Sequence, residues 1–172
     1  MRKIILYLAM SLDGFLADAE GGVGWLGGKD PAYEGDYGYG AFYQTVDTLV
    51  MGWRTYRQVT TQLSPGAWPY AGKTSYVLTH RRLPDTREIR FTAGPPLALL
   101  ERLRREDGGA VWICGGAEVV RQALPLVDEL HLSVMPRLLG GGIRLFPEGE
   151  AVPLHLASVR QENGVLLCVY TK

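Results

Sequence analysis

The chain has 172 residues, which is long enough for one domain with a real buried core and short for two. Lysine plus arginine and aspartate plus glutamate number 18 each, so the formal net charge is zero. This balance gives no indication of nucleic-acid binding or of an anionic membrane surface as a partner. We therefore expect a single domain over residues 1–172 that holds any anionic ligand by local geometry.

The first residues superficially resemble a signal peptide, because Met1-Arg2-Lys3 is basic and residues 4–10 are apolar. A cleavage-site pattern is missing, and Asp13-Gly14 interrupts the run when it is still too short for a membrane span. The two cysteines, Cys114 and Cys168, lie in apolar strand-like runs without metal-ligand spacing, as buried thiols do in a reducing compartment. The expected protein is cytoplasmic and has no metal site.

In the first half of the chain, residues 4–10 have the pattern of a buried strand, and a glycine-rich loop follows it. In a simple linker the large apolar side chains of Trp25 and Leu26 would be left in solvent. This loop is therefore either a lid that folds over a ligand or a surface loop pinned by Trp25. The spacing of apolar residues then predicts a helix over 37–46, a strand over 49–51 and a helix over 54–63 that ends at a Ser-Pro-Gly breaker.

The second half begins with further strand and helix patterns and ends in strands alone. We expect strands over 74–79, 87–91 and 110–114, with helices beginning at Pro96 and spanning 117–124. Beyond Pro125 come strands over 129–134, 154–161 and 165–171, and Asn163-Gly164 favours a hairpin between the last two. The predicted fold class is α/β, with a mostly parallel sheet, helices on both faces and antiparallel strands at the C-terminal edge.

Two strand-to-helix turns carry the strongest functional signal. In one, an apolar strand runs into Gly52 and the helix-starting Thr55; in the other, a strand ends in the pair Gly115-Gly116 and opens a helix. Glycine lets the backbone approach a ligand closely, and a helix start offers unpaired N–H groups to a phosphate. One such turn is weak evidence, but two in a small domain predict a dinucleotide.

The chain resembles the dihydrofolate-reductase-like superfamily, and within it the branch that contains the reductase domain of the bifunctional riboflavin-biosynthesis deaminase-reductase. The motifs that carry this resemblance are residues 9–14, 50–56, 113–116, 128–133, 138–142 and 145–146. The chain has three histidines and no paired cysteines, so it lacks a zinc-deaminase pattern. The resemblance is therefore to a stand-alone reductase domain with the three-layer fold of that superfamily.

The resemblance implies a reductase that transfers hydride from a nicotinamide dinucleotide, usually NADPH, to a small nitrogen-heterocyclic substrate of the pyrimidinone or pteridine class. It also implies a homodimer. By motif position, the expected cofactor contacts are Gly52, Arg54 and Thr55 at the pyrophosphate; Thr79, His80 and Arg81 near the adenosine ribose; Gly115, Gly116, Ala117 and Glu118 on the other side of the pyrophosphate; and Ala9 and Met10 at the nicotinamide.

One departure from the family concerns the choice of dinucleotide. The family has an arginine directly after the glycine of the first turn, whereas here Trp53 follows Gly52 and Arg54 comes one place later. This difference leaves NADH possible beside NADPH. Any charge for a 2′-phosphate must then come from Arg54 or from the basic residues that begin at His80.

A second departure concerns the proton donor. Dihydrofolate reductases carry a carboxylate on the first helix, and the corresponding region here holds Asp36, which is either that acid or a helix-capping residue. Asp13 and Ser11, at the end of the first strand, form the other candidate catalytic pair, although Asp-Gly also simply makes a turn.

Candidate substrate contacts are few. Trp25 of the glycine-rich loop could exclude water from a substrate, and Ser133 could bind it or be an ordinary strand hydroxyl. Two other functions remain open. One is a non-catalytic dinucleotide-binding or sensing module, and the other is a flavin-dependent oxidoreductase, for which the sequence shows no specific feature.

Overall fold

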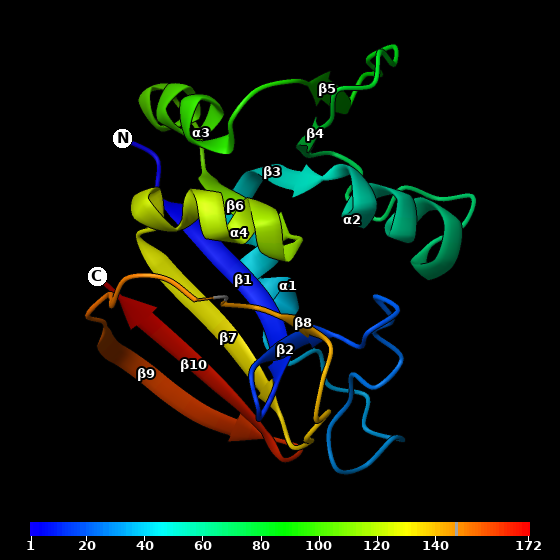
Figure 1. Cartoon of the computed structure of the whole chain (residues 1–172), viewed down its shortest axis with the longest axis vertical. Helices are drawn as coiled ribbons and strands as arrows, with labels where there is room; N and C mark the ends of the chain where they lie inside the picture. The colour runs from blue at the N-terminus through cyan, green and yellow to red at the C-terminus, as the bar shows by residue number, and fades with distance from the viewer. Residues whose placement is uncertain (147) are drawn as a thin grey trace.

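An eight-stranded sheet forms the centre of the computed structural model, which describes residues 1–146 and 148–172 (Figure 1). The strands lie in the order β5-β4-β3-β6-β1-β7-β10-β9, and all neighbours from β5 to β7 are parallel, whereas β10 is antiparallel to β7 and to β9. The strands are β1 (Ile4–Ser11), β3 (Val46–Gly52), β4 (Thr74–Leu78), β5 (Ile89–Thr92), β6 (Ala110–Gly115), β7 (Glu129–Met135), β9 (His155–Glu162) and β10 (Val165–Thr171). This is the mostly parallel sheet with an antiparallel C-terminal edge that the sequence predicted.

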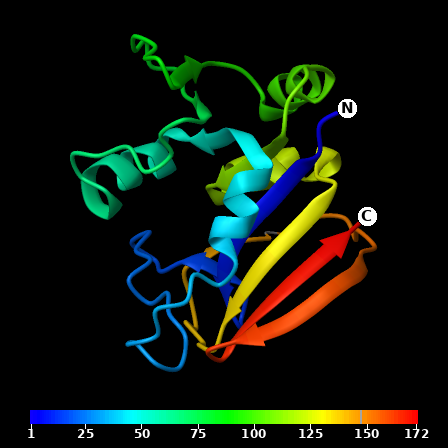
Figure 2. The same cartoon turned by 180° about the vertical axis from the view of Figure 1, so that it is seen from behind.

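Helices cover both faces of the sheet, as Figures 1 and 2 show from opposite sides. They are α1 (Tyr39–Thr45), α2 (Trp53–Gln58) with a π-helical turn (Val59–Leu63), α3 (Pro96–Arg105), and α4 (Ala117–Ala123) with a 3₁₀ turn (Leu124–Leu126). Within the described residues, none of these helices is long and apolar enough to cross a bilayer.

Each face of the sheet has its own core because side chains alternate along every strand. Leu100 and Leu103 of α3 and Val120 of α4 pack with the aliphatic residues on one face. Phe42 of α1 packs on the other face in an aromatic cluster that Trp53 and Tyr56 of α2 join. The helix after β3 and the helix after β6 therefore lie on opposite faces.

A second, two-stranded sheet was absent from the sequence prediction. It pairs β2 (Phe15–Ala17), inside the glycine-rich loop, with β8 (Ile143–Arg144). Both strands are too short to show a hydrophobic period, and they pair across more than a hundred residues of chain, so no local pattern could reveal them.

The rest of the glycine-rich loop is fastened to the hairpin between β9 and β10. Asn163 (φ 49°) and Gly164 (φ 81°) both have positive φ, as the predicted hairpin turn requires. The carbonyl of Asn163 accepts a hydrogen bond from the Lys29 amide at 2.8 Å, and its side chain accepts one from the Asp30 amide at 2.9 Å. The turn therefore closes the hairpin and also holds the loop.

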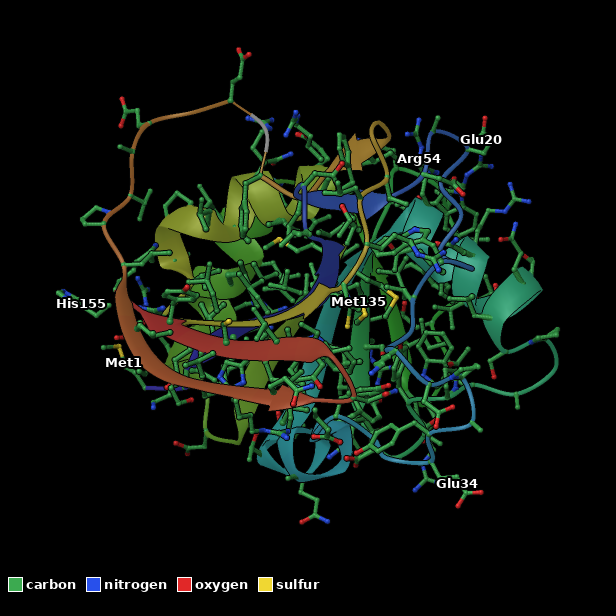
Figure 3. All side chains as sticks on the ribbon, turned by 90° about the horizontal axis from the view of Figure 1, so that it is seen from below. Met1, Glu20, Glu34, Arg54, Met135 and His155 are labelled. Atoms are coloured by element: carbon green, nitrogen blue, oxygen red, sulfur yellow. The ribbon has the colours of Figure 1, made fainter. Side chains whose placement is uncertain are left out.

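Trp25 is buried against Met135 and Val165, and its Nε1 donates to the carbonyl of Gly22 at 3.2 Å. Met135 lies inside the molecule, whereas Glu34 and His155 point outward (Figure 3). In this structure the loop is thus pinned by Trp25, the second of the two readings that the sequence left open.

Candidate functional site

The carboxyl ends of the parallel strands gather along one edge of the sheet. There β3 ends at Gly52, β4 at Leu78, β6 at Gly115 and β1 at Ser11. After β3 and after β6 the chain continues on opposite faces of the sheet. The helix α2 lies on the same face as α1, and α4 lies on the same face as α3. Open α/β sheets bind ligands at such an edge, where the connections diverge.

The two predicted glycine turns meet at this edge. A Cβ built on Gly52 would lie 3.9 Å from the amide nitrogen of Gly116, and a Cβ on Gly116 would lie 3.5 Å from the Oγ1 of Thr55. Gly52 and Gly116 are the N-cap residues of α2 and α4, and in the described part of the chain no side chain caps either helix. The first-turn N–H groups of both helices therefore have no side-chain acceptor of their own.

Basic residues follow both β3 and β4 at this edge. Arg54 is exposed on α2, and His80 and Arg81 are exposed directly after β4. Within residues 1–146 and 148–172, none of these three side chains forms an ion pair. Thr79 shapes the turn that carries the last two, because its Oγ1 accepts a hydrogen bond from the Arg81 amide at 3.1 Å. These side chains are consequently available to an anionic ligand.

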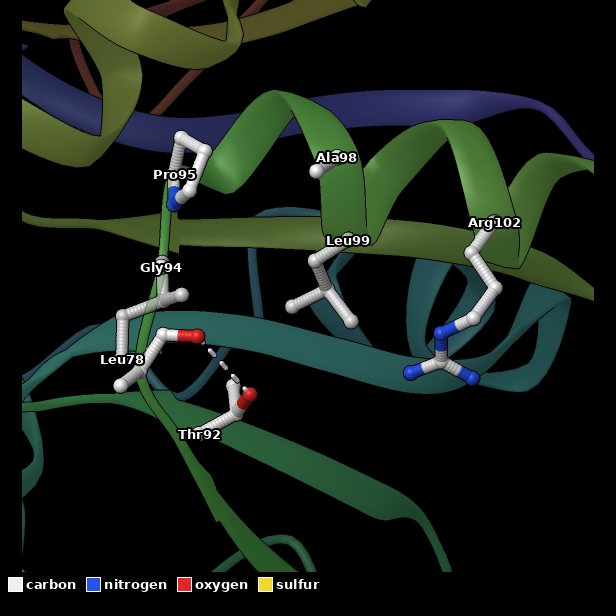
Figure 4. Close-up of a pocket in the computed structure, with 8 residues that line it drawn as sticks. Leu78, Thr92, Gly94, Pro95, Ala98, Leu99 and Arg102 are labelled. Carbon is white, nitrogen blue, oxygen red and sulfur yellow. Dashed lines mark hydrogen bonds between the residues drawn. The ribbon is translucent and has the colours of Figure 1, made fainter.

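A slot of about 210 Å³ lies beside this turn, between the ends of β4 and β5 and the start of α3 (Figure 4). Leu78 and Leu99 form apolar walls, and Gly94 and Pro95 supply backbone along one side. Sequence reasoning missed this slot because its walls come from two separate segments, Leu78 and residues 92–102. The Gly94-Pro95-Pro96 run indicates only that the chain bends there.

Ser11 and Asp13 do lie together at the end of β1, as predicted. The buried Ser11 hydroxyl donates to Asp13 Oδ1 at 2.6 Å, and its oxygen accepts a hydrogen bond from the Phe15 amide at 2.9 Å. The Asp13 carboxylate also accepts hydrogen bonds from the amides of Leu139 (3.1 Å) and Gly140 (2.8 Å). The Ser11 hydroxyl above all, and these amides with it, lower the pKa of Asp13 from 3.8 to about 2. A carboxyl that is ionised throughout the physiological range is a poor proton donor.

The lowered pKa of Asp13 predicts a specific pH dependence of stability. Because the folded-state pKa lies below the unfolded value, the carboxylate stabilises the fold fully above about pH 4, and this contribution is lost as the pH falls toward about 2. We expect the difference in unfolding free energy between the natural chain and Asp13→Asn to be constant from neutral pH to about pH 4 and to shrink below it. Denaturant unfolding across this range measures the difference. A change centred near neutral pH would instead indicate a raised pKa and a catalytic acid.

Ser133 lies on β7 directly beside Ala9 of β1, and its side chain is buried. It borders a second cavity of about 380 Å³ between α1 and the strands β7, β10 and β9. Tyr7 and Phe42, whose rings stack with centroids 4.1 Å apart, and Leu167 give this cavity a mainly apolar lining. Ser133 thus places a hydroxyl in a mainly apolar cavity that Tyr7, from the middle of β1, also lines.

The family model of the RibD C-terminal domain matches residues 2–167, which is nearly the whole chain. The chain belongs to the RibD C-terminal domain family. This membership agrees with the resemblance drawn from the motifs, and it supports a reductase of this family.

Two Bacillus subtilis (strain 168) proteins are relatives of this RibD-type domain over almost their full length. The uncharacterized protein YwjB is 40% identical over 90% of this chain and 97% of its own, and the uncharacterized protein YyaP is 30% identical over 98% and 94%. The matched region therefore accounts for nearly the whole length of both relatives.

Solved structures show the same fold. A candidate riboflavin biosynthesis protein from Shewanella sp. PV-4 superposes with a TM-score of 0.83 at 28% identity over 98% of both chains. The Thermotoga maritima deaminase/reductase matches with a TM-score of 0.74 at 16% identity. The match covers 99% of this chain and 56% of the Thermotoga chain. Dihydrofolate reductase from Enterococcus faecalis matches with a TM-score of 0.63 at 20% identity. The dihydrofolate-reductase-like α/β fold is thereby confirmed.

Asp36 directly precedes Tyr37 and Gly38, which line the cavity at Ser133. It precedes α1 and accepts hydrogen bonds from the amides of Gly40 and Gly38, both at 2.8 Å. These bonds, Gly40 first, lower the pKa of the exposed Asp36 carboxyl. These contacts are those of a helix-capping residue, the second of the two roles that the sequence left open for Asp36. A catalytic role for Asp36 stays an untested prediction.

The remaining predicted cofactor contacts divide between the two faces. Ala9 packs with Trp25, whereas Met10 packs with the aliphatic core on the opposite face, because neighbouring side chains on β1 alternate. On α4, Ala117 begins the helix, and Glu118 is exposed and held by Arg121 at 2.5 Å. Its carboxylate charge is thus partly offset by a neighbouring arginine.

An aromatic wall beside the site is the largest feature that the sequence reading missed. Tyr39, Tyr70 and Trp112 pack around Cys114, which directly precedes the glycine pair. Burial raises the pKa of the Cys114 thiol, so the sulfur stays protonated and unreactive. Both cysteines are buried and free. Among the described residues, no three His, Cys, Asp or Glu side chains are grouped to hold a metal ion.

Proposed function

We propose that this RibD-type domain is an NADPH-dependent reductase of a small nitrogen heterocycle. The observation that carries the proposal is the contact between the Gly52 turn and the Gly116 turn at the carboxyl edge of the sheet. A pyrophosphate between these turns would meet uncapped first-turn N–H groups from two helices, with Arg54 beside them.

The residues at this edge fit a dinucleotide. Gly52, Thr55 and Gly116 would hold the pyrophosphate, and Thr79 and Arg81 would lie at the adenosine ribose. The slot between Leu78 and Leu99, which Arg102 also lines, would take the adenine ring. When bound, the dinucleotide would supply a hydride at its nicotinamide.

The cavity at Ser133 supports a substrate site between α1 and the strands β7, β10 and β9. Its apolar lining and single buried hydroxyl suit a planar heterocycle of the pyrimidinone or pteridine class, which Ser133 would orient by a hydrogen bond. Trp25, packed against Ala9 and Met135, would keep water from the face of the reacting ring. The reaction would then resemble that of 5-amino-6-(5-phosphoribosylamino)uracil reductase or dihydrofolate reductase.

The proton for the reduced substrate has no ready carboxylic donor among the predicted residues. The carboxylate oxygens of Asp13 and Asp36 accept hydrogen bonds from backbone amides, and the pKa values of both carboxyl groups are lowered. We therefore assign proton delivery to water in this proposal.

Calorimetric titration with NADPH and with NADH tests the proposal first. We expect NADPH to bind. We then expect the absorbance of the reduced nicotinamide to fall when either dihydrobiopterin or a member of a set of pyrimidinones is added as substrate. A folded protein that binds neither dinucleotide would refute the reductase.

A non-catalytic dinucleotide-binding module is the second candidate, and the engagement of both carboxylates favours it. It predicts the same NADPH binding without turnover of any heterocycle. The absorbance screen therefore separates the two candidates after the titration has established binding.

The homodimer that the resemblance implies stays a prediction, and we propose the outer edge of the sheet as its interface. The side chains of Leu156 and Val159 on β9 are each 54% exposed, and Leu166 on β10 is 42% exposed. An unpaired edge strand with apolar side chains is a site for pairing with another chain. Light scattering of the purified protein measures the mass that this predicts.

A further inference from the structure

Trp53 occupies the position where the family resemblance places a basic residue. It is the first residue of α2 and directly follows Gly52 at the end of β3. Its ring packs on Tyr56 with centroids 5.4 Å apart and joins the aromatic cluster on that face of the sheet. Trp53 is therefore a fixed side chain at the entrance to the proposed pyrophosphate site.

The guanidinium of Arg81 lies over this ring, with its Cζ 5.1 Å from the ring centroid of Trp53. The two residues come together because β3 and β4 are parallel neighbours in which Gly52 pairs with Leu78. Trp53 thus lies one residue beyond the paired strand ends, and Arg81 lies three residues beyond them. The distance is within the range of a cation–π contact.

This contact occupies only one surface of the arginine. A guanidinium can stack with its flat face while its N–H groups point outward in the plane and remain free for a bidentate hydrogen bond. In the part of the chain that the structure describes, no carboxylate pairs with Arg81 or with Arg54. Within the described residues, the side-chain donors of Arg81 are thus free of a carboxylate partner.

We propose that Trp53 positions Arg81 to bind the 2′-phosphate of NADPH, so that this pair takes over the role of the missing basic residue and sets the preference for NADPH over NADH. The inference rests on the proposed function, because it assumes that the dinucleotide lies at this edge. Trp53 acts through Arg81 and is a positioning residue, whereas Arg81 contacts the phosphate. Without the ring, the exposed Arg81 side chain would sample many rotamers and bind the phosphate less well.

Calorimetric dissociation constants for NADPH and NADH test the pair without reference to turnover. We expect Arg81→Ala to weaken NADPH by roughly ten- to a hundredfold, as the loss of a charge-assisted contact does, and to leave NADH nearly unchanged. Trp53→Leu should weaken NADPH alone by about two- to fivefold, and Trp53→Phe, which keeps an aromatic face, by less. The effects should shrink at high salt, because Arg81 is exposed.

The double variant gives the sharpest measurement. If Trp53 acts through Arg81, Trp53→Leu will change the ratio of NADPH to NADH affinity in the natural chain but not in Arg81→Ala. Arg87→Ala is the matched control, because it removes an exposed cation from the same connection between β4 and β5, and among the described residues it makes no cation–π contact with Trp53.

The outcomes separate the inference from the proposed function. A natural chain that binds neither dinucleotide overturns both. Binding of NADPH and NADH with equal affinity overturns the inference and leaves the dinucleotide site. Equal weakening of both dinucleotides by Trp53→Leu also overturns it, because that result assigns the ring to packing alone.

Discussion

Gly116→Asp is expected to abolish dinucleotide binding and to leave the fold intact. The backbone at Gly116 has φ −73°, and a Cβ there would meet Thr55 Oγ1 at 3.5 Å, an ordinary contact. A new carboxylate would face the pyrophosphate, and two unit charges about 4 Å apart repel by about 4 kcal/mol at an effective dielectric constant near 20. This corresponds to a roughly thousandfold weaker Kd.

The same substitution should not lower stability. Gly116 is the N-cap of α4, where no side-chain cap is present within the described residues, and aspartate is a preferred N-cap residue. We expect a melting temperature equal to or slightly above that of the natural chain. Loss of binding then cannot be attributed to unfolding.

Gly116→Asn is the matched variant, because it adds the same volume without the charge. It should lose clearly less affinity than Gly116→Asp in calorimetric titration with NADPH. Gly115 offers no such test, since its φ of 103° strains any other residue and a substitution would disturb the turn itself. Unchanged NADPH affinity in Gly116→Asp, with a normal melting curve, would remove the glycine pair from the binding site.

Local patterns predicted the parts of the site that lie within single turns. Gly52 and Gly116 are each marked by a strand pattern before them and a helix pattern after them, so both turns could be identified without a structure. Their contact also follows from the fold class, because the carboxyl ends of parallel strands share one edge. The Asn163-Gly164 hairpin was predicted for the same reason: its dipeptide favours one turn type.

Contacts between distant segments could not be predicted in this way. Asp13 is bound by the amides of Leu139 and Gly140, which lie 126 and 127 residues away and carry no pattern that points to it. The pairing of Arg81 with Trp53 likewise depends on the register of β3 and β4, which hydrophobic alternation leaves unspecified in β3, where residues 48–51 are all buried. The contacts of single side chains could therefore be identified only from the structure, whereas the edge of the sheet at which they lie could be predicted from the sequence.

Dihydrofolate is expected to be a very poor substrate, although the fold matches that of Enterococcus faecalis dihydrofolate reductase. A pterin site needs a carboxylate beside the ring, and Asp36 instead caps the start of α1 with both oxygens bound to the amides of Gly38 and Gly40. A site without a needed hydrogen-bonding group can discriminate by roughly 10⁴ or more. We therefore expect kcat/KM for dihydrofolate at least about 10⁴-fold below that of the Enterococcus enzyme assayed beside it.

The variant Asp36→Asn decides whether this reasoning about Asp36 is right. Because hydrogen bonds from Gly40 and Gly38 lower the pKa of Asp36, the carboxyl is ionised at neutral pH and has no proton to give. Dihydrofolate turnover should then stay at background in the natural chain and in Asp36→Asn alike, while NADPH binding shows that each protein is folded and competent. Robust turnover in the natural chain that disappears in Asp36→Asn would make Asp36 the catalytic acid, and the substrate class would then be that of the pteridines.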